Sequence, residues 1–391
     1  MSKRSVFSST KASHKRRRSC TLMITRRCNL NCTYCYEEHK CNDTAFDMTF
    51  ETAKRLLRAE FSFVRSSPDF DEIEIDFMGG EPFMNFPLIK QVVEWLECEP
   101  PPVPYICFAT TNGTFVAQHK EWLSRHRDQL VLGGSVDGTD EMQVANRGWR
   151  SQEIPIDLFL KLYPFQGFHM TVSKHSLPRL ASGVLTLQRR GCLVEVALAQ
   201  GESWSSADAE EYERQLDQLA TAYLTTDRTL RPINLLSRFL GGIDGAPAEA
   251  RQKKYCGTGT HMVAYDYDGR SYGCHLFTPV VLGDKARICK SIEYSRPDVV
   301  EDAYCQSCIL KVICPTCAGF NFRYRGSIGV RDHRWCSLVL RQCVVSAIFQ
   351  MKYVVSLALP TDEDIRYLRA AVRAHEVIGA LNYDTAPFVL S

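Results

Sequence analysis

The sequence predicts an α/β fold, in which a partial (β/α)6 TIM-like barrel precedes a small cysteine-rich domain and C-terminal helices. Three observations support this prediction. Short apolar runs alternate with amphipathic stretches through the first half of the 391 residues, a pattern typical of βαβ units and a parallel sheet. Six such units are too few for a closed eight-stranded barrel. Cysteines then concentrate between residues 256 and 336, and the chain ends in two stretches with helical patterns.

The elements are expected in the following order. Strands are predicted at residues 20–25, 73–78, 105–111, 130–136, 168–172 and 193–199. Helices are predicted at 50–64, 87–97, 115–126, 176–190, 210–222, 233–240, 339–359 and 362–378. Gly79-Gly80, Asn112-Gly113 and Asp137-Gly138 directly follow the second, third and fourth strands. The carboxyl ends of parallel strands form the ligand-binding edge of such sheets, and glycine lets the backbone approach a ligand closely.

Changes in composition divide the chain into five segments. They are a basic tail (1–19), the barrel (20–205), a helical linker (206–255), the cysteine-rich domain (256–340) and the C-terminal helices (341–391). Gly241-Gly242 and Gly245-Ala246-Pro247 mark the end of the linker.

Composition and charge exclude several classes of protein. Apolar residues make up 45% and charged residues 24% of the chain, which is ordinary for a globular domain. The uninterrupted apolar runs are far shorter than the roughly 18 residues of a membrane span, so we expect a cytoplasmic protein with no membrane partner. The net charge of +2 indicates no partner, and nucleic acid is not the expected substrate.

The first 18 residues nevertheless carry seven basic side chains and no acidic one. A solvated tail is the simpler interpretation. A docking arm for an acidic peptide or a nucleic acid is the alternative, and the composition also suits a transit peptide that ends near Arg18.

The 17 cysteines are best interpreted as ligands or catalytic thiols. A secreted disulfide scaffold would be short and would begin with an apolar signal segment, whereas this chain is long and begins with basic residues. Cys28, Cys32 and Cys35 follow the first predicted strand. A structural zinc site needs four protein ligands, but a 4Fe–4S cluster with three cysteine ligands keeps one iron open for a small molecule.

The segment C-N-L-N-C-T-Y-C resembles the signature of the radical S-adenosylmethionine (SAM) superfamily, with Tyr34 at its usual aromatic position. The resemblance implies that Cys28, Cys32 and Cys35 bind a 4Fe–4S cluster and that Cys41 does not.

Further segments resemble parts of the SAM site of this superfamily. Gly79, Gly80 and Glu81 correspond to its GGE segment, which contacts the amino group of SAM. Thr111-Asn112-Gly113 and Ser135-Val136-Asp137-Gly138 match two more segments. Ser135 or Asp137 is expected to reach the ribose, and a simple turn or helix cap is the alternative.

Arginines in the predicted loop after the fourth strand are a further candidate. Arg147 and Arg150 are expected to bind the SAM carboxylate or a peptide. A surface salt bridge is the alternative.

A second group of cysteines resembles the SPASM extension, which carries two auxiliary 4Fe–4S clusters. The resemblance implies an outer cluster and an inner cluster with separate ligands. The outer ligands are Cys305, Cys308, Cys314 and Cys336, and the inner ligands are Cys256, Cys274 and Cys317. A pair of zinc ribbons is the physical alternative.

Two departures from the SPASM pattern leave its ligands open. Cys314 and Cys317 are separated by two residues instead of three. The inner cluster also lacks one cysteine, so His261, Cys289 or Cys343 fills the position, or an iron stays open for a thiolate of the substrate.

The resemblance implies an oxidoreductase that uses SAM and three 4Fe–4S clusters. Reductive cleavage of SAM would give a 5′-deoxyadenosyl radical, which abstracts a hydrogen from a ribosomally made peptide so that a carbon–carbon or carbon–sulfur cross-link forms. The implied partners are a peptide or small-protein substrate and a flavodoxin or ferredoxin. We expect no leader-binding domain before Cys28, so leader recognition would fall to a separate protein, the basic tail or the barrel edge.

The alternative reaction is that of a sulfatase-maturase-like dehydrogenase, which forms formylglycine from a Cys or Ser of a protein. Such enzymes carry an acidic general base after the cysteine that corresponds to Cys274. Here that residue is His275, which is able to act as a base at neutral pH. Glu81, Asp137 and His275 are therefore the catalytic candidates, and a non-catalytic iron–sulfur or zinc scaffold is a third interpretation.

Overall fold

The computed structural model describes residues 7, 16–149, 153–243, 256–294, 302–381 and 388. The chain divides into two compact units. The sheet unit comprises Ser13–His169 and Cys256–Arg296, and the helical unit comprises Met1–Ala12, Met170–Tyr255 and Pro297–Ser391. The predicted cysteine-rich domain is thus divided between the two units. Gly245-Ala246-Pro247 and Arg150 lie outside the described residues.

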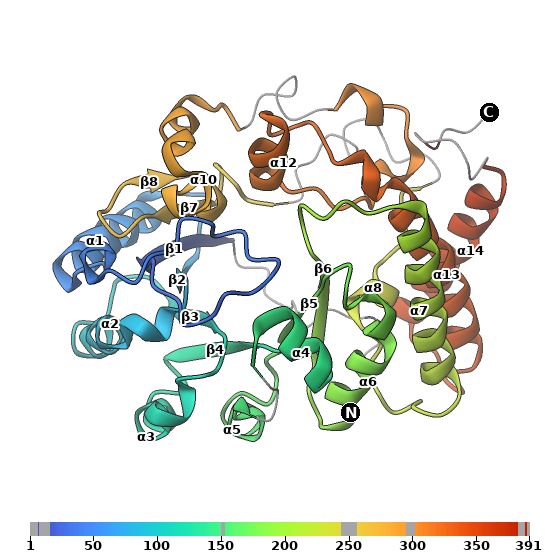
Figure 1. Ribbon diagram of the computed structural model, residues 1–391, viewed down its shortest axis with the longest axis horizontal. Coiled ribbons are helices and arrows are strands. Elements are labelled where there is room, and N and C mark those ends of the chain that lie inside the picture. The colour runs from blue at the N-terminus through green and yellow to red at the C-terminus, as the bar shows by residue number, and fades with distance from the viewer. Residues whose placement is uncertain are drawn as a thin grey trace. The chain divides into compact units, whose positions relative to one another are not determined.

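Eight strands form one sheet that is mainly parallel (Figure 1). They are β1 (Arg17–Thr25), β2 (Glu72–Gly79), β3 (Tyr105–Thr111), β4 (Leu130–Ser135), β5 (Phe168–Val172), β6 (Val194–Leu198), β7 (Met262–Tyr265) and β8 (Ser271–Tyr272). Their order is β6-β5-β4-β3-β2-β1-β7-β8. All the pairs from β4/β5 to β1/β7 are parallel, and β8 is antiparallel to β7. Because β6 and β8 are edge strands, the sheet is open, and the predicted α/β fold is confirmed.

Helices of the sheet unit cover the outer face of strands β1 to β4 (Figure 1). They include α1 (Phe50–Ser66), α2 (Phe86–Cys98) and α3 (Lys120–Arg125). Burial alternates along β2, where Ile73, Ile75 and Phe77 are fully buried and the intervening side chains are partly exposed. This period of two is what a parallel strand shows when one of its faces is packed under helices. The shorter elements of the unit are η1 (Thr44–Phe46), η2 (Pro82–Asn85), η3 (Val116–His119), η6 (His275–Phe277), α10 (Pro279–Leu282) and η7 (Gly283–Ser291).

Two short helices between β4 and β5 correct the sequence prediction of a loop there. They are α4 (Asp140–Arg147) and α5 (Ile156–Leu162). Arg147 is therefore in the last turn of a helix. Helices of seven or eight residues are too short to show a clear apolar period, although the Thr139 side chain caps α4 by accepting a hydrogen bond from the amide of Met142.

Other boundaries differ from the predictions by a few residues. The strand β1 begins at Arg17, inside the predicted tail. The predicted helix at 115–126 consists of η3 followed by α3, and the one at 233–240 is a single turn, α8 (Asn234–Ser237). The strands β7 and β8 were not predicted, because at four and two residues they lack a recognisable pattern.

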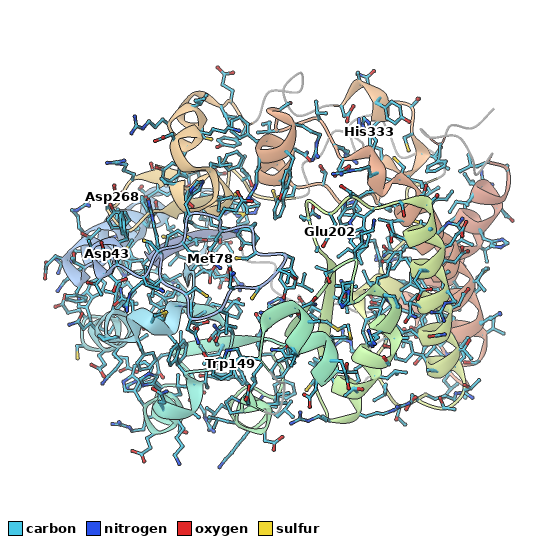
Figure 2. All side chains as sticks on the ribbon, viewed as in Figure 1. Asp43, Met78, Trp149, Glu202, Asp268 and His333 are labelled. Atoms are coloured by element: carbon cyan, nitrogen blue, oxygen red, sulfur yellow. The ribbon has the colours of Figure 1, made fainter. Side chains whose placement is uncertain are left out.

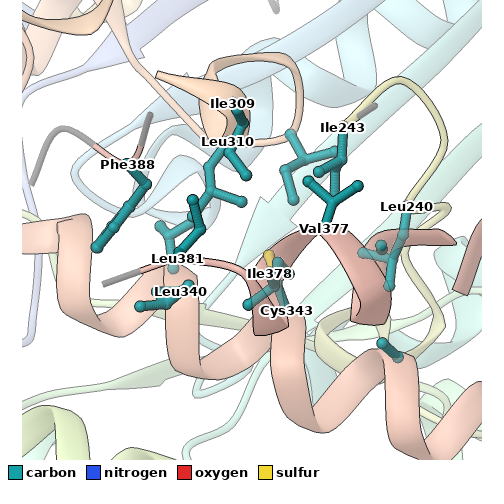
Figure 3. Packing of buried hydrophobic residues seen from close by; sticks show 14 of the residues in the cluster. Leu240, Ile243, Ile309, Leu310, Leu340, Cys343, Val377, Ile378, Leu381 and Phe388 are labelled. Atoms are coloured by element: carbon teal, nitrogen blue, oxygen red, sulfur yellow. The ribbon is translucent and has the colours of Figure 1, made fainter. Parts of the chain in front are cut away.

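The helical unit has its core between its last two helices, α13 (Cys336–Val355) and α14 (Asp362–Gly379). Figure 3 shows Leu340, Cys343, Val377 and Ile378 packed there. Its other elements include β6, η5 (Leu177–Arg179), α6 (Leu180–Arg189), α7 (Ser206–Leu224), α8, η8 (Ala303–Cys305), η9 (Ile309–Val312), α12 (Ala318–Arg325) and η10 (His333–Trp335). Within the described residues, His333–Val355 alone has the length and hydropathy of a membrane span. This helix is mostly buried inside the protein and packs against α7 and α14, as a core helix does.

One residue of the basic tail also belongs to this core. Phe7 is buried, its ring stacks on Tyr367 at 4.9 Å, and it meets Tyr353 edge-on at 5.5 Å. The Tyr367 hydroxyl donates to the Phe7 carbonyl at 3.2 Å. At Phe7, therefore, the tail is not the solvated segment that its composition predicts.

Candidate active site

The loop after β1, residues 26–41, carries the first three candidate ligands, and we call it the cysteine loop. Cys28, Cys32 and Cys35 are all partly buried. Burial raises the pKa of Cys28 to about 11 and also raises the pKa of Cys32. The charge of Cys32 contributes to the raised pKa of Cys28, and the charge of Cys35 contributes to the raised pKa of Cys32. The three thiols therefore lie within electrostatic reach of one another, as ligands of one cluster must.

The glycines that end β2 cross directly over the cysteine loop. The Gly80 amide donates to the Thr25 carbonyl at 3.3 Å, and the Glu81 amide donates to the Arg27 carbonyl at 2.8 Å. A Cβ atom on Gly79 would lie 2.3 Å from the Thr25 carbonyl oxygen, and one on Gly80 would lie 2.4 Å from that of Arg27. Only glycine permits such an approach of two backbones. Met78, labelled in Figure 2, is the residue before this crossing.

Glu81 is buried and its carboxylate accepts three hydrogen bonds from the protein. The donors are the Thr111 hydroxyl at 2.7 Å, the Phe83 amide at 3.0 Å and the Asn112 amide at 2.8 Å. Burial raises the pKa of Glu81 to about 7, although these hydrogen bonds oppose the shift. Through these hydrogen bonds the Glu81 carboxylate links the end of β2 to the end of β3.

An amide network joins the cysteine loop to the end of β3. The Asn112 side-chain amide donates to the side-chain Oδ1 atom of Asn29 at 2.9 Å, and the Asn29 side-chain amide donates to the Thr114 hydroxyl at 3.0 Å. Thr114 in turn donates to Asn112 through its amide and its hydroxyl. Asn29 and Thr114 were missed by the sequence reasoning, although both lie inside or beside the motifs that it singled out.

Asp137 is fully buried and its carboxylate forms an ion pair with Arg147. The Arg147 Nε atom lies 2.9 Å from Asp137 Oδ2, and its Nη2 atom donates to Oδ1 at 3.1 Å. Tyr34 donates its hydroxyl to Oδ2 at 2.5 Å, and Asn146 donates to the same oxygen at 3.2 Å. The predicted alternative of a surface salt bridge for Arg147 is thus wrong, because only 8% of its side chain is exposed.

This ion pair attaches the cysteine loop to the end of β4 and to α4. Tyr34 comes from the loop, and the Arg147 guanidinium lies 5.5 Å from the centre of its ring. The Thr33 amide also donates to the Asn146 carbonyl at 2.9 Å. Ser135, the last residue of β4, is partly exposed and its hydroxyl has no hydrogen-bond partner among the described residues. Of the two groups predicted to reach a ribose, the Ser135 hydroxyl is therefore the available one.

Two polar residues of the cysteine loop were also missed by the sequence reasoning. The Lys40 ammonium donates to the Cys35 Sγ atom at 3.2 Å. Glu37 is buried, its Oε1 atom lacks a hydrogen-bond partner among the described residues, and burial raises its pKa to about 8. The sequence offers no signal for either residue beyond their proximity to Cys35.

The sheet unit also contains two of the predicted inner-cluster ligands. Cys274 is buried at the start of η6, and the Cys256 Sγ atom lies 3.0 Å from the Thr258 hydroxyl. The ring of His275 lies 5.9 Å from that of Tyr36, so the Cys274 segment adjoins the cysteine loop. Burial lowers the pKa of His275 to about 4.

Candidates for the missing inner ligand lie in both units. In the sheet unit the His261 ring covers Gly257, the residue after Cys256. Cys289 is buried in η7 of the same unit. Cys343 is buried in the core of the helical unit, close to Cys308 and Cys314.

The predicted outer ligands come together in the helical unit. The pKa of Cys336 is raised to about 12, first by burial and then by the thiols of Cys314, Cys305 and Cys308. Cys317 lies in the same unit, at the residue before α12. The carboxylate of Asp302 accepts from the His333 ring at 2.8 Å, and both approach Cys305 closely enough to hold a metal ion together. Figure 2 labels His333.

The chemistry of these side chains fits iron–sulfur clusters. Thiolates are soft ligands that select iron–sulfur clusters, zinc or copper(I). Three thiols on one loop suit a cluster with an open iron, and four thiols in the helical unit suit a fully ligated one.

A family comparison defines the class of this site. Residues 22–157 match the model of the Radical SAM superfamily. The match includes the cysteine loop, the glycine crossing and the Asp137–Arg147 ion pair. These residues therefore form a radical SAM domain, to which the remaining segments are joined.

One curated protein is similar in sequence to part of the chain. An uncharacterized protein of Methanocaldococcus jannaschii is 27% identical over 165 residues, which are 41% of this chain and 54% of that protein. The matched segment thus spans about half of that curated relative.

Solved structures match the chain over more of its length. The structure of histidine-tagged anSMEcpe with bound AdoMet has a TM-score of 0.63 and 15% identity, and it covers 90% of this chain and 98% of its own. The structure of Streptococcus suis SuiB bound to its precursor peptide SuiA has a TM-score of 0.52 and 16% identity. The match covers 81% of this chain and 75% of the SuiB chain. At these identities the likeness shows a shared fold.

Proposed function

We propose that this protein is a radical SAM maturase with a SPASM domain, an oxidoreductase that abstracts a hydrogen atom from a ribosomally made peptide and installs a carbon–carbon or carbon–sulfur cross-link. The observation that carries the proposal is the crossing of Gly79-Gly80-Glu81 over the cysteine loop. Two motifs about fifty residues apart in sequence are joined backbone to backbone. A thiol ligand set thereby lies beside the edge of the sheet where the strands end and where such sheets bind ligands.

Each group of residues has a separate task in this proposal. Cys28, Cys32 and Cys35 would hold the cluster that binds SAM, and the Ser135 hydroxyl would bind the ribose. With SAM and an electron donor such as flavodoxin or ferredoxin, a cluster held there would supply the chemistry of a 5′-deoxyadenosyl radical, and the protein would position the reactants. The Asp137–Arg147 ion pair and the hydrogen bonds of Glu81 would hold the cysteine loop against the ends of the strands.

The auxiliary ligand sets complete the proposal. Four thiols of the helical unit would hold the outer cluster, and Cys256, Cys274 and Cys317 would contribute to the inner one. These clusters would accept the second electron when the substrate radical is oxidised, or bind the substrate. A peptide substrate is supported by the shared fold, since anSMEcpe was solved with the Kp18Cys peptide (TM-score 0.59, 15% identity) and SuiB with SuiA. Leader recognition would fall to a separate protein, the basic tail or the barrel edge.

Anaerobic reconstitution tests this proposal without knowledge of the peptide. The protein, loaded with iron and sulfide, should convert SAM to 5′-deoxyadenosine when dithionite is added. The variant C28A/C32A/C35A should yield none, whereas C305A/C308A should retain the activity because it keeps the loop ligands. The proposal would be refuted if protein fully loaded with iron and sulfide formed no 5′-deoxyadenosine with dithionite.

A second candidate function is a sulfatase-maturase-like dehydrogenase. It is favoured by the position of His275, which directly follows Cys274 and whose ring lies 5.9 Å from that of Tyr36 in the cysteine loop. A formylglycine product contains an aldehyde, whereas a cross-linked peptide has lost two hydrogen atoms and contains none. An aldehyde-reactive probe should therefore label the Kp18Cys peptide after turnover if this candidate is correct, and the H275A variant should abolish the labelling.

A further inference from the structure

Lys40 closes the cysteine loop through its side chain. Its ammonium donates to the Cys35 Sγ atom at 3.2 Å and to the Leu30 carbonyl at 3.4 Å. These partners lie on opposite sides of Cys32 in the sequence. One side chain thus ties the start of the loop to its last candidate ligand.

The Lys40 ammonium has no carboxylate partner within ion-pair distance in the part of the chain that the structure describes, although its charge partly opposes the burial that raises the pKa of the nearby Glu37. A partly buried ammonium usually has such a partner, because burial of a charge is costly. Burial lowers the pKa of Lys40, but the thiols of Cys35, Cys28 and Cys32 outweigh it, so the net shift is upward. The ammonium therefore lies within electrostatic reach of all three thiols.

We propose that Lys40 raises the reduction potential of the cluster held by Cys28, Cys32 and Cys35, through its fixed positive charge and its hydrogen bond to the Cys35 sulfur. The inference rests on the proposed function, because it requires the cluster. Reduction adds one negative charge to the cluster, and a nearby cation stabilises the reduced state more than the oxidised state. Hydrogen bonds to cluster sulfurs are a known determinant of such potentials.

Two other roles would leave different signatures. If Lys40 instead binds the SAM carboxylate, its replacement would raise the KM for SAM and leave the potential unchanged. If Lys40 only closes the loop, its replacement would lower the iron content or the thermal stability without changing the potential of the cluster that remains.

The test is a redox titration of the reconstituted protein, monitored by electron paramagnetic resonance. The measured signal is the part that changes when SAM is added, which separates this cluster from the auxiliary ones. In K40M the ratio of reduced to oxidised cluster at a fixed ambient potential should fall about tenfold, or ~59 mV for one electron. K40R should keep a potential close to that of the wild type.

A partly exposed lysine of α1, in the same unit, provides the matched control. Lys54 lies 3.6 Å from Glu99 and 5.0 Å from the Trp95 ring centre, so K54M should leave the potential unchanged. If K40M takes up no cluster, K40Q is titrated in its place, since it keeps a donor but loses the charge.

Each remaining outcome has a defined meaning. The inference is overturned if K40M or K40Q takes up the cluster and shows the wild-type potential. It is also overturned if neither neutral variant takes up the cluster while K40R does. A wild-type protein with no SAM-responsive cluster would instead refute the proposed function.

Discussion

At the scale of single residues, the carboxylates predicted to act in catalysis already have partners within the protein. Glu81 accepts three hydrogen bonds from residues at the ends of the sheet, and Asp137 is paired with Arg147. Loss of one partner of a buried ion pair is strongly destabilising, by about 3–5 kcal/mol. These side chains are therefore best understood as groups that position the cysteine loop, and the unpartnered Ser135 hydroxyl is better placed to meet a ligand.

Gly80 gives a prediction at this scale. A Cβ atom at Gly80 would overlap the Arg27 backbone, so the G80A variant must displace the cysteine loop. We expect a loss of roughly 1–3 kcal/mol in the free energy of unfolding, as overpacking typically causes, together with a lower iron content after reconstitution. Gly379 ends α14 with open space around it, and G379A should be neutral or stabilising by up to about 1 kcal/mol. Equal iron content in G80A and wild type would contradict the argument.

At the scale of elements, β2 shows how one strand serves two environments. The buried face of β2 packs under helices. Glu74 and Asp76 both lie on the other face of the sheet. Burial, followed by the charge of Glu74, raises the pKa of Asp76 to about 7. A carboxyl group on this face thus keeps its proton well above the usual pH range for aspartate.

The stability of the protein should depend on pH through Asp76. Between pH 4 and 7 the folded state retains a proton that the unfolded state has lost, so the free energy of unfolding should fall as the pH rises through this window. The D76N variant should lack this part of the slope, and each unit of pKa is worth about 1.4 kcal/mol. Urea denaturation at several pH values measures the effect. D284N, at a side chain that is 98% exposed, should keep the wild-type slope, and an unchanged slope in D76N would refute the assignment.

At the scale of the whole molecule, the candidate ligands are distributed over both units. The cysteine loop, Cys256 and Cys274 belong to the sheet unit, whereas the four outer ligands and Cys317 belong to the helical unit. The prediction of an inner cluster with Cys256, Cys274 and Cys317 as ligands therefore requires ligands from both units. Metal binding is coupled to folding, so each cluster should stabilise the segments that hold it.

Hydrogen exchange tests this distribution. Reconstitution should slow amide exchange at residues 26–41, 256–274 and 302–336. The C305A/C308A variant should lose the protection at 302–336 and keep that at 26–41. C317A should lose protection at 256–274 if Cys317 is an inner ligand, and unchanged exchange there would reject that ligand. Cys98 is exposed, and C98A should behave as wild type.

The positions of β1 to β6 and the candidate ligand motifs were accessible from sequence because their signals are local. The strands β3 and β5 begin and end where the apolar runs do, and the spacing of Cys28, Cys32 and Cys35 indicates a shared ligand set before any fold is known. The glycines after β2 mark the edge of the sheet for the same reason. Periodicity and spacing depend on near neighbours in the chain, and such patterns survive in the sequence.

Only the tertiary structure decided which side chains meet. The ion pair between Asp137 and Arg147, the contact of Asn29 with Asn112 and the addition of β7 beside β1 each depend on the final packing. The bond from Lys40 to Cys35 depends on how a short loop closes, which no periodic pattern records. Thus the sequence determined the candidate ligand motifs and the strands β1 to β6, whereas the packing of distant segments decided which polar groups hold the loop and which remain free for a ligand.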